Sequence, residues 1–170
     1  MAIDALVKPL RALPLFRGLA PLQLTEIVRR AERVIYAPGG VIAAENQIAD
    51  AAIIIISGRC LRLEDEGDAS RGEPLSEGTM ISELAMLVEV VHASTVIAQD
   101  RVKALRLTHN SMRELMEEEP ELAEHFSSHI CGRLHRLAED LNAVDTALAR
   151  AAAIPLAQRS LGSTQGHAVH

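Results

Sequence analysis

The middle of the chain alternates short apolar runs with turn-forming residues. Between residues 33 and 107, runs rich in Val, Ile and Leu are separated by Gly, Pro, Asp and Asn. β-Branched residues favour strands, and the residues between the runs favour turns. Short strands about every ten residues are typical of a sandwich or a rolled barrel. The predicted strand segments are RVIYAPGG, VIAAEN, AAIIIISGRCLRLED, GEPLSEGTM, ASTVIAQD and RVKALRL.

Two of these segments carry further information. The run Ile53 to Ile56 has no alternation, which indicates a strand covered on both faces. The segment RLEDEGDASRGEP at 62–74 holds seven charged residues and two glycines. It predicts an exposed hairpin tip, and a solvated loop explains its charges better than a binding site does.

Helical spacing appears at both ends of the strand-rich region. From Ala20 to Val34 the apolar residues recur near the helical period and Pro21 suits a first turn, which predicts a short amphipathic helix. After Leu107 we predict a short helix over 109–119 and a long helix that begins at Pro120.

The long helix carries a regular apolar stripe, here called the seam. Its members follow one another in steps of three and four, as the a and d positions of a heptad repeat do. Such a seam could cover the β-roll or pair with the same helix of a second copy, and we favour a homodimer. The seam consists of Leu134, Leu137, Leu141, Val144 and Leu148.

Length and composition bound the architecture. A chain of 170 residues with 48 % hydrophobic content suits one domain with a sizeable core. We predict an α+β fold over 1–153, with a jelly-roll-like β-roll at about 33–107 between short N-terminal helices and C-terminal helices at about 109–153. The segment 154–170 is polar and aperiodic, which predicts a disordered tail.

Charge and composition exclude several partners. The net charge of −6 disfavours nucleic acid and anionic membranes, and 2 % aromatic residues leave little to stack on bases. The longest internal apolar run, AAIIII, is far too short to span a bilayer, and the N-terminus lacks the apolar region of a secretion signal. Cys60 and Cys131 are too few for a disulfide framework. We therefore expect a cytoplasmic protein with free thiols.

Residues with chemical potential gather in ISELAMLVEVVHASTV, at 81–96. Ser82, Ser94, His92 and Glu83 are the residue types of a hydrolase, but the segment has no G-x-S-x-G elbow, so we expect no enzyme. Elsewhere, the helical histidines of HFSSH at 125–129 lack a third ligand. We predict that they are surface or helix-packing residues and form no metal site.

The order of elements and two motifs resemble the cyclic nucleotide-binding domain family over roughly residues 13–150. IIIISGRCLRL is similar to the family's Ile/Val-rich strand and turn glycine, here Gly58. ISELAML and VHASTV resemble in register the phosphate-binding cassette, typically Phe-Gly-Glu-Leu-Ala-Leu and Pro-Arg-Ala-Ala-Thr-Val. Glu83 and His92 have the nine-residue spacing of the family's Glu and Arg.

The resemblance implies a ligand site. It implies that Glu83 accepts a hydrogen bond from a ribose 2'-hydroxyl and that the free backbone N–H groups of Leu84 and Ala85, at the start of a small helix, face a cyclic phosphate. His92 stands where the family has its phosphate-clamping Arg, and Ser82 stands for a Gly. The implied ligand-binding residues are Ser82, Glu83, Leu84, Ala85, His92, Ala93 and Ser94.

Other positions also depart from the family pattern. Asn46 and Gln47 replace a Gly-Asp pair, although Asp50 is retained. In the long helix, Leu137 and Ala138 stand where the cAMP receptor protein places a Thr-Ser pair on the adenine. These departures imply weaker binding, because Arg offers a permanently charged fork and a neutral His at most one donor.

The expected function is that of a stand-alone regulatory sensor. It would bind cAMP, cGMP or a related small anion, would need no cofactor, and would signal to an unknown protein partner through the long helix. No helix-turn-helix unit of about 70 residues follows that helix, so we expect no DNA binding. The alternative is a degenerate member that no longer binds nucleotide and acts as a dimeric interaction module.

Overall fold

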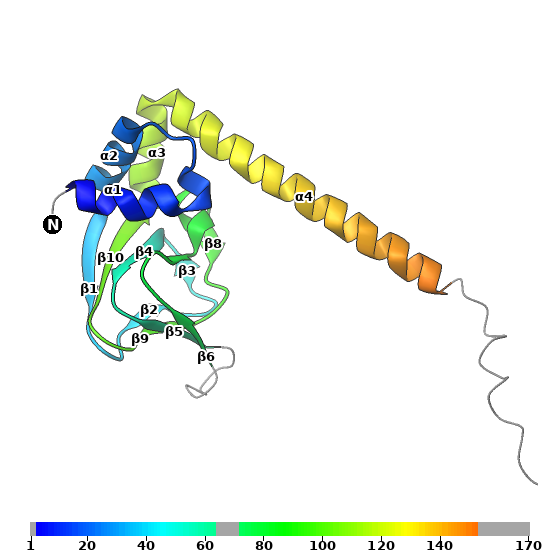
Figure 1. Ribbon diagram of the computed structural model, residues 1–170, viewed down its shortest axis with the longest axis horizontal. Helices are drawn as coiled ribbons and strands as arrows, with labels where there is room; N and C mark the ends of the chain where they lie inside the picture. Colours follow the sequence, from blue (N-terminus) through cyan, green and yellow to red (C-terminus); the bar gives the residue numbers. More distant parts are fainter. Residues whose placement is uncertain (1–2, 64–71, 153–170) are drawn as a thin grey trace, which may run out of the picture. The chain divides into compact units, whose positions relative to one another are not determined.

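The strands form three antiparallel sheets that roll around an apolar interior (Figure 1). The structure is a computed structural model that describes residues 3–63 and 72–152. The sheet orders are β1-β10-β4-β7, β2-β9-β5-β6 and β3-β8. The strands are β1 (Glu32–Tyr36), β2 (Val41–Ala43), β3 (Ile48–Ala49), β4 (Ala51–Ser57), β5 (Cys60–Leu63), β6 (Gly72–Leu75), β7 (Met80–Ile81), β8 (Val90–Val91), β9 (Val96–Ala98) and β10 (Val102–Thr108).

Strand β4 is buried on both faces, as its run of isoleucines predicted. Ile53 and Ile55 pack between the two four-stranded sheets, whereas Ile54 packs with the helices. Successive side chains of a strand point to opposite faces, so one strand contributes to two apolar clusters. We call these the roll-interior cluster, which holds Ile53 and Ile55, and the helix-side cluster, which holds Ile54.

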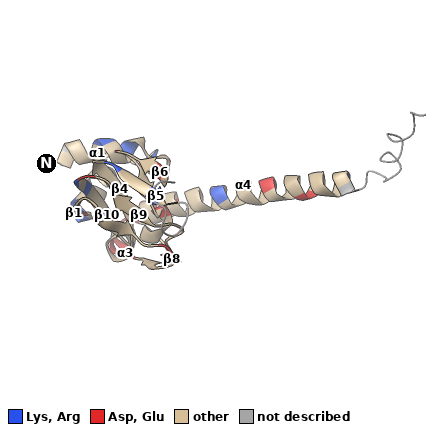
Figure 2. Ribbon diagram, turned by 90° about the horizontal axis from the view of Figure 1, so that it is seen from below, with Lys and Arg blue, Asp and Glu red and all other residues tan. Residues whose placement is uncertain are grey.

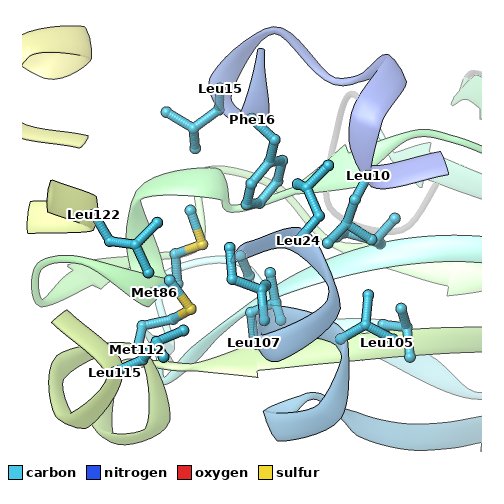
Figure 3. Packing of buried hydrophobic residues seen from close by; sticks show 14 of the residues in the cluster. Leu10, Leu15, Phe16, Leu24, Met86, Leu105, Leu107, Met112, Leu115 and Leu122 are labelled. Atoms are coloured by element: carbon cyan, nitrogen blue, oxygen red, sulfur yellow. The ribbon is translucent and has the colours of Figure 1, made fainter. Parts of the chain in front are cut away.

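The helix-side cluster joins the helices to the outer face of the sheet (Figure 3). The rings of Phe16 and Phe126 meet edge to face, with centroids 6.0 Å apart. The helices are α1 (Ile3–Ala12), η1 (Pro14–Phe16), α2 (Pro21–Arg30), η2 (Glu83–Met86), α3 (His109–Glu118) and α4 (Pro120–Ala152). The α+β fold class and the β-roll are therefore confirmed.

The first helix predicted from the sequence is shorter in the structure. We expected it to reach Val34, but α2 ends at Arg30 and Glu32 already belongs to β1. Ala31 has extended backbone angles, φ −68° and ψ 135°. The apolar positions of β1 continued the helical period by coincidence, and pairing with β10 made this segment a strand.

Helices α3 and α4 begin close to where the sequence predicts. Thr108 caps α3 by accepting a hydrogen bond from the Ser111 backbone N–H, 3.2 Å from N to Oγ1. Pro120 is the first residue of α4. Arg30 of α2 forms an ion pair with Glu118 of α3, which ties these two helices together.

The chain divides into two compact units. One comprises the described residues up to Phe126, and the other comprises those from Ser127 onward. The seam lies in the second unit, and each of its side chains is between 55 % and 62 % exposed. Acidic and basic positions both occur along α4 (Figure 2).

Two parts of the sequence-based interpretation lie outside the described residues. The predicted hairpin tip falls largely on 64–71, although the flanking residues Leu63 and Gly72 do pair in register. The predicted tail, 154–170, is likewise outside the described range. Within the described part of the chain, none of the helices has the length and apolar character needed to cross a membrane.

One turn glycine is required by close packing. Gly58 joins β4 to β5 with φ +100°. A Cβ atom there would lie 2.8 Å from the Arg101 carbonyl oxygen. Both the backbone conformation and the space therefore require glycine at this turn.

Substituting Met86 measures how much the burial of η2 contributes to the stability of the fold. We expect Met86→Ala to lower the free energy of unfolding by about 2–5 kcal/mol, because a fully buried methionine leaves a cavity. Leu22→Ala is the matched control, since Leu22 is 71 % exposed and should change stability by less than about 0.5 kcal/mol. Urea denaturation followed by circular dichroism measures both, and equal effects would contradict the expectation.

Candidate functional site

The predicted small helix forms directly after strand β7. Ile81 pairs with Ile53 of β4, and Ser82 follows with φ 51° and ψ 50°. This left-handed conformation is ordinary for glycine and uncommon for serine. The Ala85 backbone N–H donates to the Ser82 carbonyl oxygen over 2.9 Å, which closes the first turn of η2.

Helix η2 has one buried and one cavity-facing side. Ala85 and Met86 are fully buried. Figure 3 shows Met86 within the helix-side cluster, near Met112 and Leu122. Glu83 and Leu84 instead line a cavity on the roll side. The buried methionine thus fixes the orientation of the residues that face the cavity.

The cavity has a volume of about 700 Å³, which is within the range for small-molecule sites. Ser82, Glu83 and Ser94 supply polar groups to it, and apolar side chains form much of its wall. The lining residues are Arg62, Met80, Ile81, Ser82, Glu83, Leu84, Val90, Val91, Ala93 and Ser94.

His92 is held by the turn that replaces the family's Gly-Asp pair. Its backbone N–H donates to the Gln47 carbonyl, and its carbonyl accepts from the Asn46 N–H, both over 2.9 Å. Asn46 has φ 61°, a conformation that asparagine tolerates better than most residues. The turn therefore forms without glycine, and His92 is only 8 % exposed.

The two substituted cassette residues contact each other. Ser82 Oγ lies 2.6 Å from His92 Nδ1, which is a hydrogen bond between the residues that replace Gly and Arg. Burial lowers the pKa of His92 below its usual 6.5, and the charge of Asp50 opposes this only in part. His92 is therefore mostly neutral at pH 7.

Asp50, whose charge acts on His92, does not complete a catalytic triad with the Ser–His pair. Asp50, which acts on His92 through space, binds Arg106 through both carboxylate oxygens at 2.7 Å. This pairing with Arg106 lowers the pKa of Asp50. In a triad the carboxylate binds and orients the imidazole. Asp50 binds Arg106 instead, so Ser82, His92 and Asp50 do not form a hydrogen-bonded triad.

A second cavity, of about 590 Å³, has one residue of η2, Ala85, in its lining. Four carboxylate residues line it, namely Glu32, Asp50, Glu89 and Glu114. Glu32 and Asp50 share one partner, Arg106, and none of the described lining residues is a lysine or arginine, so the lining disfavours an anion. A phosphate-bearing ligand is therefore better matched to the first cavity.

The structure brings five of the seven predicted ligand residues to one cavity. Ser82, Glu83, Leu84, Ala93 and Ser94 all line it. The other two lie differently. The backbone N–H of Ala85 is not free as expected, because it donates to the Ser82 carbonyl oxygen, and His92 contacts Ser82 without lining the cavity.

Sequence reasoning missed five residues of this cavity, and Arg62 is the one charged residue among them; the other four are Met80, Ile81, Val90 and Val91. Arg62 lines it from β5, but it stands between Leu61 and Leu63, and that alternation suggests an arginine facing solvent. The reverse orientation follows from strand pairing, which a single sequence does not reveal.

The predicted packing role of His125 fits its contacts. Its Nε2 atom lies 2.9 Å from the Leu15 carbonyl oxygen, and its ring meets Phe126 edge to face. Among the described residues, no group of three or more His, Cys, Asp or Glu side chains is placed to hold a metal ion.

Comparison with known proteins identifies the family of the chain. The model of the family "Cyclic nucleotide-binding domain" matches residues 33–119, more than half of the chain. A cAMP-dependent protein kinase regulatory subunit of Blastocladiella emersonii is 26 % identical over 109 residues, 63 % of this chain and 27 % of that protein. The match thus spans less than two thirds of that relative's length.

Solved structures show the same fold at 23 % identity. The N-terminal domain of a transcriptional regulator from Streptomyces coelicolor has a TM-score of 0.69, covering 78 % of this chain and 94 % of that one. A cyclic nucleotide-binding-like protein from Brucella abortus has a TM-score of 0.59, covering 65 % of this chain and 97 % of that one. The catabolite activator protein of Thermus thermophilus has a TM-score of 0.60, covering 78 % of this chain and 63 % of that one. Because the family model matches more than half of the chain, the chain belongs to the cyclic nucleotide-binding domain family.

Proposed function

We propose that the protein is a regulatory sensor that binds a cyclic nucleotide weakly, or a related small anion, in the 700 Å³ cavity. The observation that carries the proposal is the cassette geometry. Ser82 adopts the left-handed backbone conformation that glycine would take, and η2 then presents Glu83 and Leu84 to the cavity. The Glu83 carboxylate can accept a hydrogen bond from a ribose hydroxyl.

The proposed binding is weak because the cassette lacks a permanent cation. A neutral His92 offers one donor at most, and that imidazole already contacts Ser82. Charge-assisted hydrogen bonds contribute about 1.5–3 kcal/mol, so replacing the Arg fork costs about tenfold to a hundredfold in affinity. Ser82 and His92 are assigned to binding and not to catalysis.

The proposed output runs through a dimer formed by α4. The seam exposes five large apolar side chains, and an exposed apolar stripe of this kind marks an interaction surface. Its steps of three and four are those of a coiled coil, in which the same stripe on a second copy of the helix would pack against it. We therefore propose a homodimer that passes the signal to a protein partner.

A second candidate function is favoured by one observation. The Ser82–His92 hydrogen bond joins two groups that a phosphate would otherwise contact. A chain that no longer binds nucleotide would keep the fold and the seam, and would act as a dimeric interaction module. Ligand titration separates the two functions.

We expect cAMP and cGMP to bind about tenfold more tightly at pH 5.5 than at pH 7.5. A protonated His92 attracts the phosphate, and its pKa is lowered, so affinity rises as pH falls through and below 6.5. His92→Arg should bind more tightly at both pH values and lose the pH dependence. Isothermal titration calorimetry measures these affinities.

His92→Gln is the matched control for that titration. It keeps a hydrogen-bonding side chain but does not titrate, so its affinity should stay low and flat with pH. An absence of binding by the wild type and by His92→Arg at millimolar ligand would reject the sensor and leave the interaction module.

For the seam, we expect Leu141→Asp to convert the dimer to a monomer. A carboxylate in the middle of an apolar helix pair is desolvated without a partner. Ala143→Asp adds the same charge at an exposed position of α4 outside the seam and should leave the dimer intact. Sedimentation equilibrium measures the mass, and a wild-type monomer would refute the dimer.

A further inference from the structure

Arg62 faces the inside of the roll. It lies directly opposite Val96 of β9, which is fully buried in the roll-interior cluster. Cys60, two residues earlier on β5, belongs to the same cluster. Paired residues on neighbouring strands, and residues two apart on one strand, share a face of the sheet. An arginine is therefore built into the inner face of β5.

This arginine brings a positive charge to the candidate site. Arg62 lines the same cavity as Ser82, Glu83 and Ser94. Of the described residues that line it, Arg62 alone is basic, and His92 is absent from that lining. A guanidinium stays charged at every physiological pH, whereas a buried imidazole does not.

Arg62 is held by one carboxylate. Its Nη1 atom lies 2.6 Å from Glu73 Oε2, and Glu73 is its cross-strand partner on β6. The two side chains are 36 % and 54 % exposed, so water screens the pair. An ion pair as exposed as this is weak, and a better anion can replace the carboxylate.

We propose that Arg62 binds the phosphate of the ligand from β5 and so takes over the charge that the cassette lacks at His92. Glu73 then acts as an internal competitor, because it occupies the guanidinium until the phosphate displaces it. Phosphate oxygens fit the planar fork of an arginine as well as a carboxylate does. The inference rests on the proposed function, and it names a binding residue outside the cassette motif.

A purely structural role for the Arg62–Glu73 pair predicts a different effect of substitution. If the Arg62–Glu73 contact only clamps β5 to β6, removing either partner disturbs the cavity in the same way. If Arg62 binds the ligand and Glu73 competes with it, the two removals have opposite effects. The sign of the change in affinity therefore distinguishes the two roles.

The experiment compares four proteins by isothermal titration calorimetry at pH 7.5, with cAMP, cGMP and inorganic phosphate as probes. They are the wild type, Arg62→Gln, Glu73→Gln and Arg59→Gln. Arg59 is the matched control, since it lies on the turn before β5, pairs with Asp100 at 3.0 Å and does not line the cavity. Thermal unfolding of each variant checks that it is folded.

We expect Arg62→Gln to bind cyclic nucleotide about tenfold or more weakly, as loss of a charge-assisted contact implies. Glu73→Gln should bind more tightly than the wild type, and Arg59→Gln should match it. Equal weakening by Arg62→Gln and Glu73→Gln, or unchanged binding by folded Arg62→Gln, would overturn the role of Arg62. Binding by the wild type in those cases would leave the sensor itself standing, whereas an absence of binding by wild type and His92→Arg would reject both.

Discussion

The two-sided burial of β4 is the constraint on which the site depends. Ile54 packs toward the helices, while Ile53 and Ile55 pack into the roll. The same strand pairs with β7, so its position sets where Ser82 leaves the sheet. Met86 then enters the helix-side cluster four residues later. A segment fixed at both ends has little freedom, and η2 is therefore held in place before any ligand arrives.

The fold imposes glycine-like geometry on residues that are not glycine. Asn46 and Ser82 both have positive φ, 61° and 51°. Asparagine adopts this conformation at modest cost, whereas for serine the strain is about 1–2 kcal/mol. Surrounding packing and strand pairing offset that strain. The added hydroxyl of Ser82 reaches His92, so the shape of the cassette is retained while its chemistry changes.

Helix η2 contributes residues to two cavities of different charge. Glu83 and Leu84 line one, together with Arg62 and two serines. Ala85 belongs to the lining of the other, which holds four carboxylate residues. The two cavities therefore differ in how well they suit an anion. The arginine on β5 shows that the charge of a binding site need not come from the motif that identifies the family.

The sequence by itself determined most of the elements and the cassette. The turn residues between strands, the isoleucine run and the helical periodicity are local signals. They predicted the β-roll, the burial of β4 on both faces and the start of α4. The resemblance of ISELAML and VHASTV to a known motif located five residues of one cavity. These features depend on near neighbours in the chain, so a single sequence records them.

Tertiary structure alone decided the rest. The short strands β3 and β8 exist because Ile48 and Val91 pair across 43 positions of sequence, and neither segment signals this alone. Helix α2 ends where it does because the residues that follow it form β1, which pairs with β10. The inward face of Arg62 and the contact between Ser82 and His92 follow from strand register and folding across ten or more residues. Long-range pairing sets such geometry, and local pattern does not encode it.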